Sequence, residues 1–170
     1  MHDISLYLLE ILENSIRAGA AHIDVALRID ETSDELRLVV DDDGCGLSAT
    51  PEQTLDPFYT TKPGKKTGLG LSLFKEEAEA AGGDLTIGES PALGGVRVET
   101  WMSLDHLDRP PLGDVGQSVF LMAMTNPEIE FAVSLTGDRF DPPLLRASPR
   151  QAAARLAEYR SERQQPTRES

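Results

Sequence analysis

Apolar side chains recur every three or four positions near the start of the chain, a spacing that places them on one side of a helix. The residues that share this spacing are Ile4, Leu8, Ile11, Leu12 and Ile16. Asp3 precedes them as a plausible N-cap, and Gly19 follows them as a plausible stop. The pattern therefore predicts an amphipathic helix over about residues 3–18.

Alternating apolar and polar positions predict four strands farther along the chain. The alternating residues are Ile23, Val25, Leu27 and Ile29; Leu36, Leu38 and Val40; Leu85 and Ile87; and Val96, Val98 and Thr100. A second helix is expected over about 68–81, with an apolar face made of Leu71, Phe74, Ala78 and Ala81. These elements predict an α+β fold, an α/β sandwich in which helices cover one face of a mixed, mostly antiparallel sheet.

The pattern changes after residue 105. Prolines and a glycine at 109–113 interrupt it, and beyond them lie an apolar segment at 115–124, an alternating strand at 129–135 and a helix-prone stretch at 151–163. We expect a main domain over 1–105, a small α/β extension over 106–163 and a flexible tail over 164–170. The extension is a candidate surface for docking or for homodimer formation.

Charge narrows the range of partners. The formal net charge is −13, which argues against nucleic acid or an anionic membrane as a partner, so a phosphate ligand has to be held by local groups. All four lysines fall between Lys62 and Lys75. The single Cys45 excludes an intramolecular disulfide, and we interpret it as a packing residue rather than a redox switch. With neither a basic leader nor a long apolar run, the chain is expected to be cytoplasmic.

The first predicted helix carries a second, polar face. Glu10, Asn14 and Arg17 follow one another at spacings of four and three, so they project from one side, away from the apolar stripe. This face is either a working surface or an ordinary solvated one.

Three consecutive aspartates end the second predicted strand. Alternation turns Asp42 inward and Asp41 and Asp43 towards solvent. A buried carboxylate needs a donor, and the exocyclic amino group of adenine is a suitable one. Gly44 and Gly46 let the backbone turn and let a flat base approach. The alternative is a hairpin turn with incidental acids.

The segment 41–67 has no sustained periodicity, which is typical of a functional loop or lid. Residues 67–71 open the second helix, whose free backbone N–H groups suit a phosphate. The preceding loop contains lysines and glycine or proline breaks, as a lid over a polyphosphate would.

Four motifs in this order resemble those of the Bergerat-fold superfamily of gyrase, Hsp90, histidine kinases and MutL, across about residues 3–103. The motifs are the N box at Leu9–Ala20, the first glycine box at Asp42–Leu47, the F box and lid at Asp56–Pro63, and the second glycine box at Thr67–Leu71.

The resemblance implies Mg²⁺ and ATP as cofactors. Asn14 would coordinate Mg²⁺, Asp42 would bind the adenine amino group, and Gly44 and Gly46 would wall the base. Phe58 would support the lid, and Arg17 would contact phosphate. The remaining nucleotide-binding residues would come from the lid and the second glycine box: Thr60, Thr61, Lys62, Lys65, Lys66, Thr67, Gly68, Leu69, Gly70 and Leu71.

Within the superfamily, histidine kinases place a phosphoacceptor histidine on a preceding dimerisation helix, and His2, His22 and His106 stand outside any such motif. Glu10 lies four residues before Asn14, where a carboxylate can act as a catalytic base. We therefore expect a stand-alone signalling kinase that transfers the γ-phosphate of ATP to a partner protein.

Two alternatives stay open. One is a conformational switch or slow ATPase that regulates a partner complex, and the other is an ATP sensor with little turnover. The segment 104–163 is similar to the extension of short ATP-binding proteins that accompany iron-only hydrogenases, which would make a redox enzyme the regulated partner.

Overall fold

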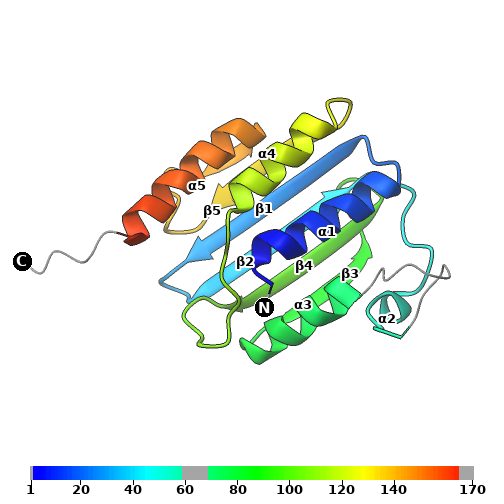
Figure 1. Cartoon of the computed structure of the whole chain (residues 1–170), viewed down its shortest axis with the longest axis horizontal. Helices are drawn as coiled ribbons and strands as arrows, with labels where there is room; N and C mark the ends of the chain where they lie inside the picture. Colours follow the sequence, from blue (N-terminus) through cyan, green and yellow to red (C-terminus); the bar gives the residue numbers. More distant parts are fainter. Residues whose placement is uncertain (1, 59–68, 165–170) are drawn as a thin grey trace, which may run out of the picture.

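A computed structural model describes residues 2–58 and 69–164 of the chain. The predictions for Thr60, Thr61, Lys62, Lys65, Lys66, Thr67 and Gly68 lie outside the described residues. Six strands form one sheet in the order β3-β4-β2-β1-β5-β6 (Figure 1). The strands are β1 (His22–Asp30), β2 (Glu35–Asp42), β3 (Asp84–Glu89), β4 (Val96–Ser103), β5 (Glu130–Thr136) and β6 (Leu144–Ala147). The helices are α1 (Ile4–Arg17), α2 (Pro51–Thr54), α3 (Leu69–Ala80), α4 (Val115–Thr125) and α5 (Pro149–Gln164).

The sheet is mixed and mostly antiparallel, as the sequence predicts. β1 and β2 form a hairpin whose register runs from Ile23 opposite Asp42 to Asp30 opposite Glu35. β4 lies antiparallel between β2 and β3, and β6 lies antiparallel to β5. β5 pairs in parallel with β1.

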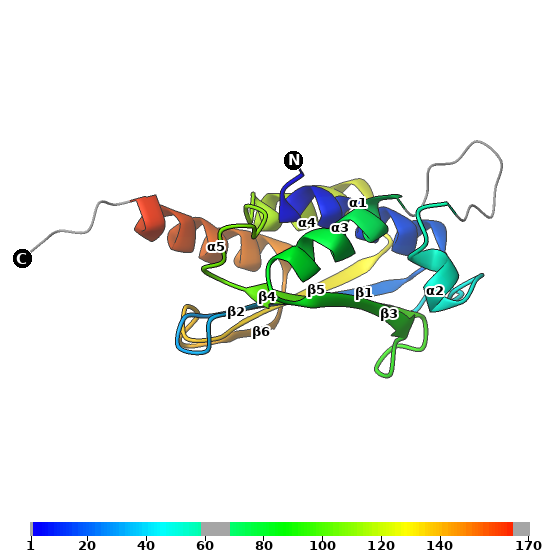
Figure 2. The same ribbon diagram turned by 90° about the horizontal axis from the view of Figure 1, so that it is seen from below.

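Helices α1, α3, α4 and α5 cover one face of this sheet (Figure 2). Their apolar stripes meet the inward residues of the strands in a continuous core, because both sets of side chains must leave water. Its fully buried members include Leu8 and Leu12 of α1, Phe74 of α3 and Leu27 of β1. The predicted sandwich is therefore confirmed.

Helix α1 is anchored at both ends. The Asp3 carboxylate accepts a hydrogen bond from Leu6 N at 2.9 Å, which confirms the predicted N-cap. Two further N–H groups at the start of α1 donate to the distant segment before α4: Ile4 N to Pro111 O at 2.8 Å and Ser5 N to Leu112 O at 3.1 Å. Gly19 ends the helix with a φ of +77°.

The segment after residue 105 continues the same sheet and core. β5 runs beside β1 from His22 opposite Glu130 to Arg28 opposite Thr136. Phe131, Val133 and Leu135 are buried together with the residues of β1, and Leu156 of α5 packs against the same core. The role of this segment in docking or dimerisation stays a prediction.

No helix within residues 2–58 and 69–164 is both long enough and apolar enough to cross a lipid bilayer.

Candidate functional site

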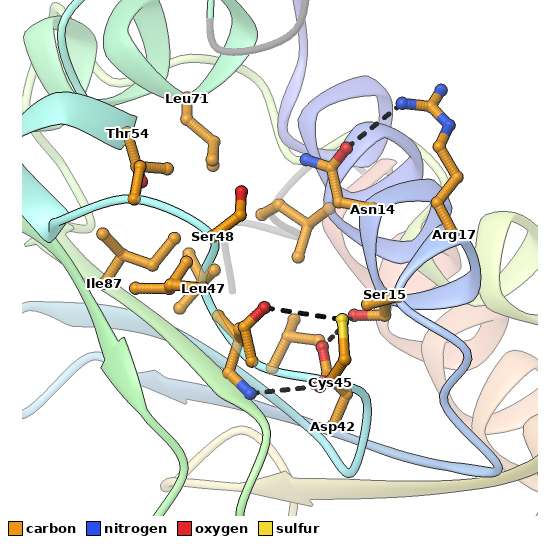
Figure 3. Close-up of a pocket in the computed structure, with 17 residues that line it drawn as sticks. Asn14, Ser15, Arg17, Asp42, Cys45, Leu47, Ser48, Thr54, Leu71 and Ile87 are labelled. Carbon is orange, nitrogen blue, oxygen red and sulfur yellow. Dashed lines mark hydrogen bonds between the residues drawn. The ribbon is translucent and has the colours of Figure 1, made fainter. Parts of the chain in front are cut away.

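A cavity of about 380 Å³ opens between α1, the ends of β2 and β4, and the loop that follows β2 (Figure 3). This volume is within the range of small-molecule sites. Aliphatic side chains form much of its wall: Ile11, Val40, Leu47, Leu71, Ile87, Val96 and Val98. Polar groups enter from α1, β2, the loop and the end of α2: Asn14, Ser15, Arg17, Asp42, Ser48 and Thr54. An apolar slot with a few convergent polar groups suits a flat heterocycle with a polar edge.

Asp42 is the buried acid of this cavity, with only 3% of its surface exposed. Its Oδ2 accepts a hydrogen bond from Ser15 Oγ at 2.6 Å, and its Oδ1 accepts from Gly44 N at 2.9 Å and Val96 N at 3.0 Å. These three donors offset the cost of burying a carboxylate and fix its orientation. A carboxylate offers about four acceptor positions, so one can still receive an amino group of a ligand.

The predicted exposure of Asp41 is wrong. Alternation correctly turns this residue to the other face of the sheet, but Asp41 is buried there, at 7% exposure. Arg97 lies directly opposite it on β4 and donates from Nε at 2.8 Å and from Nη2 at 3.0 Å, while Ser90 Oγ donates at 2.7 Å. A cross-strand partner from a distant part of the chain thus covers this carboxylate, which alternation alone does not reveal.

Asp43 also points away from the cavity, where it binds the start of β1. Its Oδ1 accepts from Ala21 N at 2.7 Å and from His22 N at 2.9 Å, and its Oδ2 lies 2.7 Å from His22 Nδ1. The pKa of the Asp43 carboxyl lies below its ordinary value because the carboxylate accepts hydrogen bonds from the backbone N–H of His22, the His22 ring and the backbone N–H of Ala21. The same contact raises the pKa of His22, with a smaller contribution from Glu130.

The two glycines of the first glycine box differ in position. Gly46 lines the cavity with a φ of +85°, a backbone conformation that residues with a side chain rarely adopt. Gly44 packs against the end of α1 instead, since a Cβ there would lie 2.8 Å from Ala18 Cβ and 2.9 Å from Ala18 O. Gly44 therefore lets the loop approach the helix, while its N–H helps to hold Asp42.

Ser15, Gly95 and Val96 position Asp42 but are not among the sequence-predicted site residues. Ser15 sits within the apolar stripe of α1, and a polar residue at such a position could have indicated a buried hydrogen bond. Gly95 belongs to the pair that joins β3 to β4. A Cβ at Gly95 would lie 2.2 Å from Asp42 Oδ1 and 2.7 Å from Gly44 N, so only glycine fits beside the carboxylate.

Asn14 and Arg17 both line the cavity, as the polar face of α1 predicts. Arg17 Nη1 donates to Asn14 Oδ1 at 3.4 Å (Figure 3). Arg17 also pairs with Glu13 at 3.5 Å. Asn14 thus offers an amide oxygen, an ordinary Mg²⁺ ligand, and Arg17 offers a cation for phosphate.

Glu10 lies one turn before Asn14 and faces the first turn of α3. A Cβ built on Gly70 would lie 1.4 Å from Glu10 Oε2, so the carboxylate rests directly over this glycine. The free N–H groups and the dipole of a helix favour an anion at this end. The structure therefore places the predicted base, Glu10, against Gly70 of the predicted phosphate cradle.

The remaining side chains that the sequence analysis singled out in this region fall in different places. Leu71 lines it, whereas Phe58, just before residues 59–68, is 92% exposed. Lys75 is turned away and binds Asp84 and Glu79 on its own side of the molecule, which raises its pKa. Cys45 is exposed and lines the cavity, and its N–H donates to Ala18 O at 2.9 Å.

The residues present fit a nucleotide with its metal. Asp42 presents an acceptor at the apolar end of the cavity, where an adenine amino group would be recognised. Asn14 and Arg17 line the cavity from α1, and Glu10, one turn before Asn14, lies against Gly70 in the first turn of α3. Mg²⁺ in such sites takes few protein ligands and several phosphate oxygens, so one amide oxygen from Asn14 is an adequate protein contribution.

The part of the chain that forms this cavity is similar in sequence to known proteins. A family model described as "Histidine kinase-, DNA gyrase B-, and HSP90-like ATPase" matches residues 2–106. The signal transduction histidine-protein kinase AtoS of Escherichia coli K12 is 34% identical over 89 residues, which cover 51% of this chain and 14% of AtoS. The sensor protein kinase CarS of Pseudomonas aeruginosa is 35% identical over 106 residues, which cover 60% of this chain and 24% of CarS. The chain therefore spans less than a quarter of the length of these relatives.

Among solved structures, the mycobacterial sensor histidine kinase MprB is similar with 26% identity and a TM-score of 0.45, covering 61% of this chain and 69% of that one. The Aquifex aeolicus MutL ATPase domain complexed with ADP matches 95% of this chain and 70% of its own, with 16% identity and a TM-score of 0.42. With the family model matching more than half of its residues, the chain belongs to the family of histidine kinase-, DNA gyrase B- and HSP90-like ATPases, and it contains an ATP-binding domain of the histidine kinase type.

Proposed function

We propose that this protein binds Mg²⁺ and ATP in the Asp42 cavity and transfers the γ-phosphate to a partner protein. The observation that carries the proposal is the position of Glu10, whose carboxylate rests on the first turn of α3, one turn of α1 away from Asn14. A base at this place would lie beside the phosphates of a nucleotide whose adenine is bound at Asp42.

Glu10 would act on the nucleophile. As the partner's hydroxyl or imidazole attacks the γ-phosphorus, Glu10 accepts its proton, the bond from that phosphorus to the bridging oxygen breaks, and ADP leaves. The metal supplies charge neutralisation on the phosphates. Asn14 would hold it, and Arg17 would add positive charge at the same end.

The acceptor is expected to come from another protein because the described histidines are engaged elsewhere. His22 lies between Asp43 and Glu130, and His106 Nδ1 accepts a hydrogen bond from Asp108 N at 3.1 Å. His2 lies beside the ring of Tyr7. Among the residues that the structure describes, no histidine lines the Asp42 cavity.

The same base could instead activate water. Glu10 would then support slow ATP hydrolysis, and the output would be a conformational change in a partner complex. The two functions differ in the destination of the γ-phosphate, so one labelling experiment separates them.

The test is incubation of the purified protein with γ-labelled ATP and Mg²⁺, with and without cell extract of the source organism. We expect label on one partner protein, and we expect Glu10→Gln to abolish it while equilibrium ATP binding persists. Glu76→Gln is the matched control, since Glu76 is an exposed acid on α3 outside the cavity. Asp42→Asn should abolish binding itself.

Free phosphate without a labelled protein would favour the ATPase, and binding without any turnover would favour a sensor. Transfer at the wild-type rate in Glu10→Gln would remove Glu10 from the mechanism.

A further inference from the structure

A second cavity lies at the opposite end of the β1–β2 hairpin from Asp42. It has a volume of about 240 Å³. Ile29 near the end of β1 and Leu36 at the start of β2 form one side of it. The segment from Leu104 to Gly113 and the last turns of α5 form the other. In Figure 1 this region lies where the β1–β2 turn approaches the end of α5.

The lining of this cavity has an apolar base. Ile29, Leu36 and Leu104 are at most 2% exposed, and the partly buried Leu112 completes the aliphatic surface. Such a base favours a ligand with an apolar body, because its contact surface leaves water on binding.

The charged groups of the lining are of one sign. Arg109 and Arg160 both contribute to it, and no aspartate or glutamate is among the described residues that line it. Two guanidinium groups at one cavity stand out in a chain with a net charge of −13. Arginine presents a planar set of donors that matches a carboxylate or a phosphate.

Both arginine side chains are already fixed in place. Arg109 donates from Nε to Leu104 O at 2.5 Å and from Nη1 to Pro110 O at 2.9 Å. Arg160 pairs through Nη1 with Asp114 at 2.8 Å, and 43% of its side chain is exposed. Because these contacts restrict the rotamers before binding, a ligand would lose less side-chain entropy on association.

We propose that this cavity binds a small organic anion, a carboxylate or phosphate group joined to a short apolar body. The volume lies below the range typical of drug-sized ligands, so the body is at most about one ring or a short chain in size. The anion would lie against Arg160 and Arg109, and the body against Leu36, Leu104 and Leu112.

An occupant would also touch the segment that anchors α1. Pro111 O and Leu112 O hold the first two N–H groups of α1, the helix that carries Asn14 farther along. Binding next to Leu112 should therefore slow amide hydrogen exchange at Ile4 and Ser5, since these hydrogen bonds open only when the segment moves.

Binding can be measured by titration calorimetry with benzoate, phenylphosphonate and neutral benzamide as probes, at constant ionic strength and with Mg-ATP present. We expect saturable binding of at least one anion and none of benzamide. Loss of a charge-assisted contact in Arg160→Gln should weaken binding roughly tenfold or more. Leu112→Trp should fill the cavity and abolish binding.

The matched control is Arg150→Gln, which removes a charge from the same helix at a side chain that lies over the Phe120 ring and outside the cavity. It should bind like the wild type. Preference for benzoate or for phenylphosphonate identifies the head group, and either result supports the proposal.

Four outcomes would overturn it: no saturable binding of either anion, equal binding of benzamide, anion binding that is seen only when Mg-ATP is left out, or unchanged binding in Arg160→Gln. If Leu112→Trp does not fold, as judged by circular dichroism, Arg160→Gln alone decides.

Discussion

Gly70→Ala is the substitution whose effect the structure specifies most sharply. The new methyl would lie 1.4 Å from Glu10 Oε2, so the carboxylate has to swing away from the first turn of α3. The helix would gain about 0.5–1 kcal/mol from replacing glycine by alanine. It would lose the carboxylate at its N-terminus, an interaction of about 0.3–1 kcal/mol. We therefore expect almost no net change in stability.

The same substitution should behave differently when Glu10 is already absent. In Glu10→Ala the methyl meets no carboxylate, so Gly70→Ala should stabilise the protein by the full 0.5–1 kcal/mol or so. The two residues should thus show a coupling free energy of about 0.3–1 kcal/mol, together with any strain of displacement.

The assay is urea unfolding of the wild type, both single variants and the double variant, followed by circular dichroism. With a slope of about 2 kcal/mol per molar urea, the expected coupling corresponds to a midpoint difference of roughly 0.2–0.5 M. The contact between Glu10 and α3 is refuted if Gly70→Ala changes the free energy of unfolding equally, within about 0.3 kcal/mol, in the wild type and in Glu10→Ala.

Three further outcomes are expected. Ser15→Ala removes a buried donor from Asp42 and should lower the free energy of unfolding by about 1.5–3 kcal/mol in urea denaturation, and a loss below about 0.5 kcal/mol would contradict the hydrogen bond. Gly95→Ala inserts a Cβ 2.2 Å from Asp42 Oδ1, so it should lower the free energy of unfolding by about 1–3 kcal/mol and reduce ATP affinity in titration calorimetry. Unchanged affinity would mean that ATP binding does not depend on the position of Asp42. The hydrogen bond with Asp43 raises the pKa of His22 in the folded protein. The contact therefore stabilises the fold fully below the pKa of an unfolded histidine, about 6.5, and this stabilisation is lost as pH rises through the pKa of His22 in the folded state. The stability difference between wild type and His22→Gln should therefore be larger at about pH 5.5 than at about pH 8.5, and a constant difference would refute the contact.

Local periodicity was enough to predict most helices and strands. The 3.6-residue period of α1 and the alternation of β1 and β2 follow from which side of each element faces the core, and the N-cap follows from a side chain next to the first turn. The parallel pairing of β1 with β5 was not predicted, because a contact between segments about 100 residues apart leaves no local pattern.

In the candidate site, too, the sequence predicted the features that depend on one strand but not those that depend on contacts with a distant strand. Alternation identified Asp42 as the inward acid, since this depends on its own strand alone. The prediction from alternation that Asp41 is exposed was wrong, because Arg97 of β4 covers this carboxylate. Gly95 likewise acts on Asp42 from the other strand, so its role is visible only in three dimensions.

The pairing of β5 with β1 also decides where the chain can be divided. The family match ends at residue 106, yet β1 is an interior strand only because β5 lies beside it along His22–Arg28. A fragment that stopped at the family boundary would present that row of backbone donors and acceptors as an open edge, a recognised template for aggregation. It would also leave the first two N–H groups of α1 without Pro111 O and Leu112 O. We therefore expect the autonomous folding unit to be larger than the family domain, and expression of the shorter piece should yield aggregate rather than a smaller nucleotide-binding module.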